Sequence, residues 1–132
     1  MTTILLCVLA AALMPIACAG IAKRHGFGVR RRDGGYDNHA PREWLARQTG
    51  LPARANAAQA NCFEALPFFV GAVAIALALE APAARVEALA LAWVALRIAY
   101  VGCYLADRAL ARSVVWLAAM GVNAAILFAA SW

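Results

Sequence analysis

A guanidinium, an amide and a carboxylate lie close together at the start of a long apolar run. Arg54, Asn61 and Glu64 precede the apolar segment 65–79, and no turn signal separates the two parts. Spacings of seven and three residues place these side chains on one face of a single helix. A carboxylate carried into a bilayer on a defined face is energetically costly and needs a partner. The sequence therefore predicts a polar site whose second charge lies elsewhere in the chain.

The partner that we expect for Glu64 is Arg97. Both residues lie ten positions from the same end of neighbouring antiparallel helices, which is roughly 15 Å at ~1.5 Å per residue. Tyr100 matches Asn61 in depth by the same count, and Tyr104 lies one turn further along the same face. Counting therefore predicts a buried Glu64–Arg97 ion pair with polar neighbours.

Two interpretations of this cluster remain open. The pair could simply hold the helices together, with Asn61 and Tyr100 as hydrogen-bonding groups between helices. Alternatively, the cluster lines a cleft whose mouth carries basic residues such as Arg54 and Arg112, which attract an anionic, water-soluble ligand. The lipid-facing sides of the same helices admit an apolar molecule. Such a cleft can join a hydrophilic anion to a hydrophobic electrophile.

The composition requires these residues to sit in a membrane. Apolar residues make up 65% of the 132 residues and charged residues only 14%, against about 45–50% and about 25% in soluble proteins. We predict an all-α fold, an integral membrane four-helix bundle that forms one domain over residues 1–132. The expected helices span about 3–23, 53–80, 84–106 and 113–132. The first could instead be a signal peptide, but no basic residue precedes it and its length is typical of a membrane span.

The basic residues predict how the bundle is oriented. Loops one and three, together with Arg54, hold ten Lys and Arg residues, whereas the second loop and the termini hold one. Basic loops stay in the cytoplasm, so we expect both termini outside. We interpret these charges first as a topology signal and second as a binding surface for an anionic lipid or an anionic substrate, and we expect no nucleic-acid partner. The four cysteines lie singly, without the spacing of a zinc site, so no metal is expected.

Two separated motifs resemble a known family. The segment Arg54-x-x-Ala-Ala-Gln-Ala-Asn61-x-x-Glu64-Ala-Leu-Pro is similar to the second-helix signature of the membrane-associated proteins in eicosanoid and glutathione metabolism (MAPEG). The segment Arg97-Ile-Ala-Tyr100-Val-Gly-Cys-Tyr104, followed by Arg112-Ser113, resembles the third-helix signature. The motif Asn38-x-x-Pro41-Arg42 is similar to bacterial members, which implies a location in a bacterial inner membrane.

The resemblance implies a homotrimer of four-helix bundles with glutathione bound between subunits. In that family the residues matching Asn61, Glu64, Arg97 and Tyr104 contact glutathione. The arginine matching Arg112 helps to stabilise the thiolate, and Ser113 matches a residue proposed for the same role. We add Arg54 and Tyr100 because of their positions, so the expected binding residues are Arg54, Asn61, Glu64, Arg97, Tyr100 and Tyr104. The expected catalytic residues are Arg112 and Ser113.

The function expected from this resemblance is that of a glutathione-dependent transferase or peroxidase acting on lipophilic electrophiles. The chain departs from many glutathione-using members at Ala57 and Gln59, where those members carry an arginine and a histidine. The alternative is a non-catalytic membrane scaffold or lipid-binding trimer, in which the Glu64–Arg97 pair is structural. The expected partners are further copies of the chain, membrane lipids and a lipophilic small molecule.

Overall fold

The computed structural model describes all 132 residues and contains helices but no strand. Four helices are long and apolar enough to cross a membrane: α1 (Thr2–Lys23), α3 (Gly50–Ala78), α4 (Ala83–Leu105) and α5 (Ala109–Leu127). A short 3₁₀ turn (Arg31–Asp33) and helix α2 (Pro41–Ala46) lie between α1 and α3. The predicted all-α fold with four membrane-spanning helices is confirmed.

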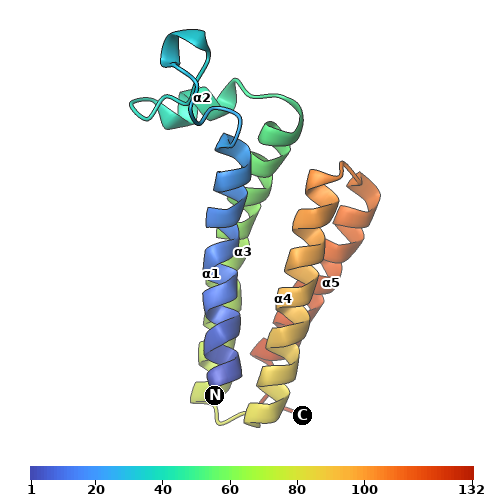
Figure 1. Ribbon diagram of the computed structural model, residues 1–132. Coiled ribbons are helices and arrows are strands. Elements are labelled where there is room, and N and C mark those ends of the chain that lie inside the picture. Colours follow the sequence, from blue (N-terminus) through green and yellow to red (C-terminus); the bar gives the residue numbers. More distant parts are fainter.

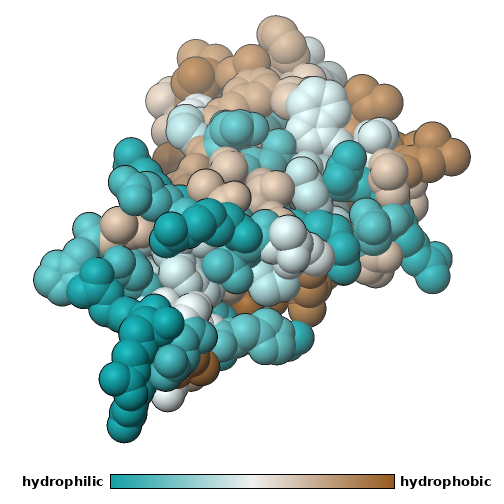
Figure 2. Space-filling view, turned by 90° about the horizontal axis from the view of Figure 1, so that it is seen from above, coloured by the Kyte–Doolittle hydropathy of each residue, from teal (hydrophilic) through white to brown (hydrophobic).

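The four long helices run side by side, and both chain ends lie at the same end of the bundle (Figure 1). Helix α1 packs against α3 and α4, and α5 packs against α4 and α3. The polar segment 24–49, which contains α2, lies at the opposite end, above α1 and α3 (Figure 1). Seen from above, much of the surface carries hydrophilic side chains, with apolar ones toward the far side (Figure 2).

The lengths and outer surfaces of the helices suit a lipid environment. They contain 22, 29, 23 and 19 residues, and about 20 residues cross the ~30 Å hydrocarbon core of a bilayer. Large apolar side chains point away from the bundle, including Leu5 (68% exposed), Ile98 (60%) and Leu110 (81%). Such exposure would be unfavourable in water but replaces lipid–lipid contacts at no cost in a membrane.

Small residues bring the helices close together inside the bundle. Ala72 and Ala76 of α3 and Ala90 of α4 are fully buried, so the backbones approach each other closely. Next to them, the rings of Phe69 and Trp93 stack with centroids 3.9 Å apart and planes 3° apart. This stack joins α3 to α4 below the polar cluster and fixes the relative height of the two helices.

The turn between α4 and α5 is shorter than the sequence suggested. Asp107 adopts a left-handed conformation (φ 59°), and the N–H of Arg108 donates to the backbone oxygen of Cys103 at 2.9 Å. This closure is typical of a helix C-terminus and lets the next helix begin immediately. Helix α5 therefore begins at Ala109 rather than at the expected Ser113, and it ends at Leu127.

The first polar segment is more ordered than the loop that we expected. Pro41 begins α2, where its missing N–H needs no partner, and Trp44 of that helix is buried. The segment therefore forms a small packed unit on the end of the bundle.

Candidate functional site

A hollow of about 400 Å³ opens on the surface of the bundle where α3, α4 and α5 meet. We call this hollow the bundle cleft. Polar and apolar side chains line different parts of it. Its lining residues are Asn61, Tyr100, Arg112, Ser113, Trp116 and Leu117. Four of these six were predicted as site residues, so the structure brings the second- and third-helix motifs to one place.

Arg97 lies behind the cleft, and its side chain is only 2% exposed. Its Nη2 donates to Asn61 Oδ1 at 2.9 Å and to the backbone oxygen of Asn61 at 3.3 Å. The guanidinium carbon also lies 4.4 Å from the ring centroid of Tyr100. All of these partners are neutral. The positive charge of Arg97 is therefore solvated by dipoles and a π-face without being cancelled by a carboxylate.

The predicted direct ion pair between Glu64 and Arg97 is wrong. No ion pair within 4 Å joins them, and Glu64 instead accepts a hydrogen bond from Asn61 Nδ2 at 3.3 Å. Asn61 thus connects the two charges, which also border one small cavity of about 50 Å³. Counting along helices gave the correct height but not the rotation about each axis. Glu64 is exposed on the outer face of α3, whereas Arg97 points into the bundle.

Because α5 begins early, Arg112 lies at the end of its first turn and Ser113 follows directly. The guanidinium of Arg112 lies 4.4 Å from the ring centroid of Tyr104 and forms no ion pair and no hydrogen bond with the chain. Ser113 donates its hydroxyl hydrogen to the backbone oxygen of Ala109 at 3.2 Å. Arg112 is therefore a half-buried cation at the cleft whose charge is free to meet an anion.

Arg54 does not line the cleft. Its Nε donates to the backbone oxygen of Leu105 at 3.1 Å, and its Nη1 lies 3.7 Å from Asp107 Oδ2. A cation at the C-terminus of a helix interacts favourably with the last carbonyls and with the helix dipole. In this structure Arg54 therefore holds the end of α4 beside the turn that leads to Arg112.

Two residues near the site were not predicted. Trp116 borders both the cleft and the small cavity below it. Asn123 borders that cavity, is 2% exposed, and has an Oδ1 without a hydrogen-bond partner. The signal for Asn123 was its position as the single strongly polar residue of an apolar span. Trp116 offered no such signal, because aromatic residues are common in membrane helices.

Side chains that commonly hold metals do not gather anywhere in the fold. No group of three or more His, Cys, Asp or Glu side chains lies close enough to hold an ion. The chemistry of the cleft is instead that of two guanidinium groups, an amide, a hydroxyl and a phenol.

Comparison with known proteins identifies the family. A model of the MAPEG family matches residues 3–132, which is almost the whole chain. No curated protein and no solved structure gives a match. The family match agrees with the four apolar helices of the fold. The chain is an integral membrane protein that belongs to the MAPEG family.

Proposed function

We propose that the protein is a glutathione-dependent transferase that acts on lipophilic electrophiles. One observation carries this proposal: Arg112 lines the cleft, Arg97 lies behind it, and neither has a carboxylate partner. Uncompensated cations at membrane depth are costly and favour binding of an anion. Members of this family generally use glutathione, an anion at neutral pH.

The residues present fit the groups of glutathione. Arg112 offers guanidinium N–H donors that no other side chain occupies. Asn61 offers amide groups, and the exposed carboxylate of Glu64 suits an ammonium group. The cleft volume of about 400 Å³ lies within the range of about 300–1,000 Å³ typical of small-molecule sites.

The chemical role that we assign to Arg112 is stabilisation of the glutathione thiolate. A nearby guanidinium favours the thiolate, which is the nucleophilic form, over the thiol. The thiolate sulfur forms a bond to the electrophilic carbon of the second substrate, and the electron pair of the broken bond leaves with the leaving group. Ser113 lies beside Arg112 and has a hydroxyl lone pair and a rotatable proton to support the same anion.

The second substrate reaches the cleft from the lipid. Trp116 and Leu117 form its apolar part, and Leu117 is 63% exposed on the outside of the bundle. A lipophilic molecule dissolved in the membrane can therefore approach the polar part of the cleft without first entering water.

We also propose the finer features that the family match does not reach: a homotrimer in a bacterial inner membrane, with both termini outside and the basic loops in the cytoplasm. Glu64 supports the assembly, because an exposed carboxylate inside the membrane is costly unless another subunit covers it. Segment 24–49 and the α4–α5 turn, which carry the basic residues, lie at the same end of the bundle (Figure 1), and this shared position supports the orientation.

The scaffold alternative has one observation in its favour: Arg97 already has partners in Asn61 and Tyr100. The two functions separate in one experiment. The purified protein is titrated with glutathione by calorimetry and is then assayed for conjugation of glutathione to a chlorinated dinitrobenzene. S-methylglutathione is the matched control, because it retains the carboxylates but cannot form a thiolate. A transferase binds glutathione and releases chloride, whereas no heat and no conjugate at millimolar glutathione would reject the proposal in favour of a scaffold.

A further inference from the structure

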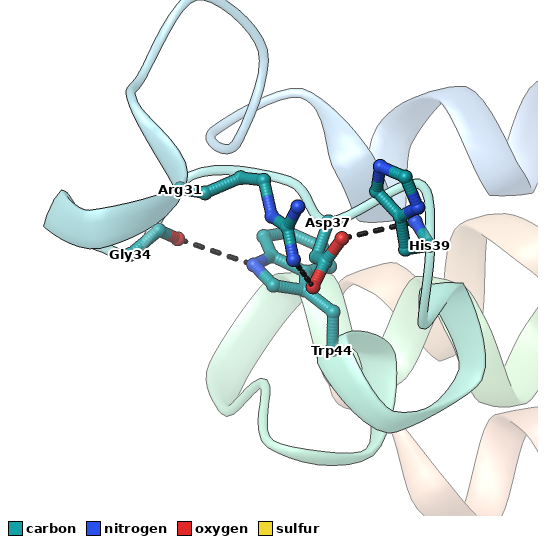
Figure 3. Close-up of polar contacts among 5 residues, drawn as sticks. All are labelled: Arg31, Gly34, Asp37, His39 and Trp44. Carbon is teal, nitrogen blue, oxygen red and sulfur yellow. Dashed lines mark hydrogen bonds and ion pairs between the residues drawn. The ribbon is translucent and has the colours of Figure 1, made fainter.

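The segment between α1 and α3 is built around one buried aromatic side chain. Trp44 of α2 is only 5% exposed, and its indole N–H donates to the backbone oxygen of Gly34 at 3.1 Å (Figure 3). The ring of Tyr36 meets that of Trp44 edge-on, with centroids 5.3 Å apart and planes at 90°. Lys23, at the end of α1, lies 4.7 Å from the centre of the Tyr36 ring. These contacts hold the segment in one shape above the bundle.

Glycines are required at positions where this segment folds back on itself. Gly34 has a positive φ of 89°, which other residues rarely adopt. A Cβ on Gly35 would lie 1.9 Å from the backbone oxygen of Val29, and a Cβ on Gly26 would lie 2.6 Å from the ring of Trp44. The fold of the segment is therefore specified in detail, which a mere connection between two helices does not need.

The packed segment encloses a basic hollow of about 620 Å³, which we call the loop pocket. Its lining contains three arginines, one aspartate and only one hydrophobic side chain. The lining residues are Arg31, Arg32, Gly34, Gly35, Asp37, Trp44, Arg47 and Gln48. The pocket is separate from the bundle cleft, and the two share no residue.

Only one of the three arginines is neutralised within the pocket. Arg31 Nη2 donates to Asp37 Oδ2 at 2.8 Å, and Asp37 Oδ1 accepts the backbone N–H of His39 at 2.9 Å (Figure 3). The His39 N–H and then the charge of Arg31 hold the pKa of Asp37 below its usual range, so this carboxylate stays ionised. Arg47 has no ion pair, and Arg32 has only a 3.9 Å contact with Asp33 outside the pocket. The pocket therefore keeps an excess of positive charge.

Apolar side chains on the same segment indicate which anion the pocket meets. Phe27 (58% exposed) and Val29 (44%) project from the segment close to the end of α1, where the membrane-spanning part of that helix stops. Exposed aromatic and aliphatic groups beside arginines are typical of a surface that lies at the boundary between headgroups and acyl chains.

We propose that the loop pocket binds the phosphate of an anionic phospholipid headgroup. Guanidinium groups match phosphate oxygens in geometry and form paired, charge-assisted hydrogen bonds with them. Arg32 and Arg47 supply free donors, while Asp37 fixes the position of Arg31. A soluble phosphate would satisfy the same donors, but the adjacent Phe27 and Val29 favour a phosphate carried by a lipid. This inference does not depend on glutathione binding.

The test uses the whole protein, purified in detergent and studied by native mass spectrometry. Short-chain phosphatidylglycerol, which is anionic, is compared with phosphatidylcholine, which has no net charge. The pocket variant is Arg32→Gln with Arg47→Gln, and the matched control is Arg30→Gln with Arg42→Gln, which removes the same charge from the same segment outside the pocket. A further arm adds inorganic phosphate at millimolar concentration.

We expect the wild type to retain phosphatidylglycerol in preference to phosphatidylcholine. The pocket variant should bind phosphatidylglycerol about 30-fold more weakly, because each arginine near an anionic surface contributes about 1 kcal/mol. The control should bind as the wild type does, and inorganic phosphate should not displace the lipid. Equal losses in both variants would show a diffuse charge effect, displacement by phosphate would show a soluble ligand, and no loss in either would show no site. Each of these results would overturn the proposal.

Discussion

The arginines at the helix ends and the arginines beside the bundle cleft have the same side chain but opposite surroundings. Arg54 and Arg85 donate to backbone oxygens near the ends of helices, those of Leu105 and Ala129, at 3.1 and 2.7 Å. Arg97 and Arg112 also lack a carboxylate partner, as Arg85 does, but they lie over tyrosine rings and neither donates to the last carbonyls of a helix. The helix-end pair interacts with the negative end of a helix dipole, whereas the cleft pair keeps its full charge.

Partners, more than burial, therefore separate an arginine used by the fold from one that is available to a ligand. Arg97 is more deeply buried than Arg54, yet Arg54 is the residue whose charge the fold already uses. Burying a cation beside neutral groups costs stability, and the anion in the proposed function would offset that cost.

Replacement of Arg112 should have the largest effect. Arg112→Ala is expected to lower turnover about 10²–10³-fold, the usual effect of removing one donor that stabilises a developing anion. Its stability should change little, because Arg112 forms no hydrogen bond with the chain. Conjugation kinetics of the purified variant provide the measurement. Arg108→Ala is the matched control, since Arg108 is exposed one helical turn before Arg112 and does not line the cleft. Equal losses in the two variants would show that only the local positive charge matters.

A double-mutant cycle on the buried polar cluster should have the next largest effect. Arg97→Met and Asn61→Ala are expected to show a coupling of about 1–2 kcal/mol, because a hydrogen bond to a charged group joins the two residues. Arg97→Met combined with Glu64→Gln should give less than half that coupling, since no direct contact joins them. Unfolding in mixed micelles measures both cycles. If Arg97 were coupled more strongly to Glu64 than to Asn61, the result would contradict this expectation and support the ion pair predicted from the sequence.

The outcome at this cluster shows what the sequence could determine. The four spans were predictable, because apolar runs near 20 residues have one stable solution in a bilayer. The meeting of Asn61 and Tyr100 at one cleft also followed from counting depth in antiparallel helices. The direction of Glu64 did not, because rotation about a helix axis depends on packing such as the Phe69–Trp93 stack.

The helix ends and the structure of the first loop could not be predicted from the sequence, for a related reason. The early start of α5 depends on a left-handed Asp107, a conformation that the residue type permits but does not require. The helix α2 and the pocket around Trp44 arise from tertiary contacts between residues that are individually typical of loops. A segment as short as this one has no hydrophobic periodicity from which such packing can be predicted.

Replacement of the helix-end arginine Arg85 should affect stability and spare turnover. Arg85→Met is expected to lower the free energy of unfolding by about 1–2 kcal/mol, because it removes a charged donor to Ala129 and the contact with the ring of Trp132. Thermal unfolding in detergent measures the loss, and the conjugation assay measures turnover. A variant of normal stability would show that Arg85 does not serve as a cap, which would remove half of the comparison.

The smallest effect is expected for Arg31, an arginine at the aqueous surface that already forms an ion pair with Asp37. The folded-state pKa of Asp37 is lowered, so its contribution to the order of segment 24–49 is complete above the unfolded pKa near 3.9 and is lost as pH falls through the folded value. Arg31→Gln should raise this pKa only partly, because the backbone N–H of His39 is the larger cause. Carbon-13 NMR of the Asp37 carboxyl group, titrated from pH 6 to pH 2, measures the midpoint. A midpoint unchanged by Arg31→Gln would show that this arginine, unlike those at the helix ends, forms no effective pair, and that its charge belongs with the free cations of the loop pocket.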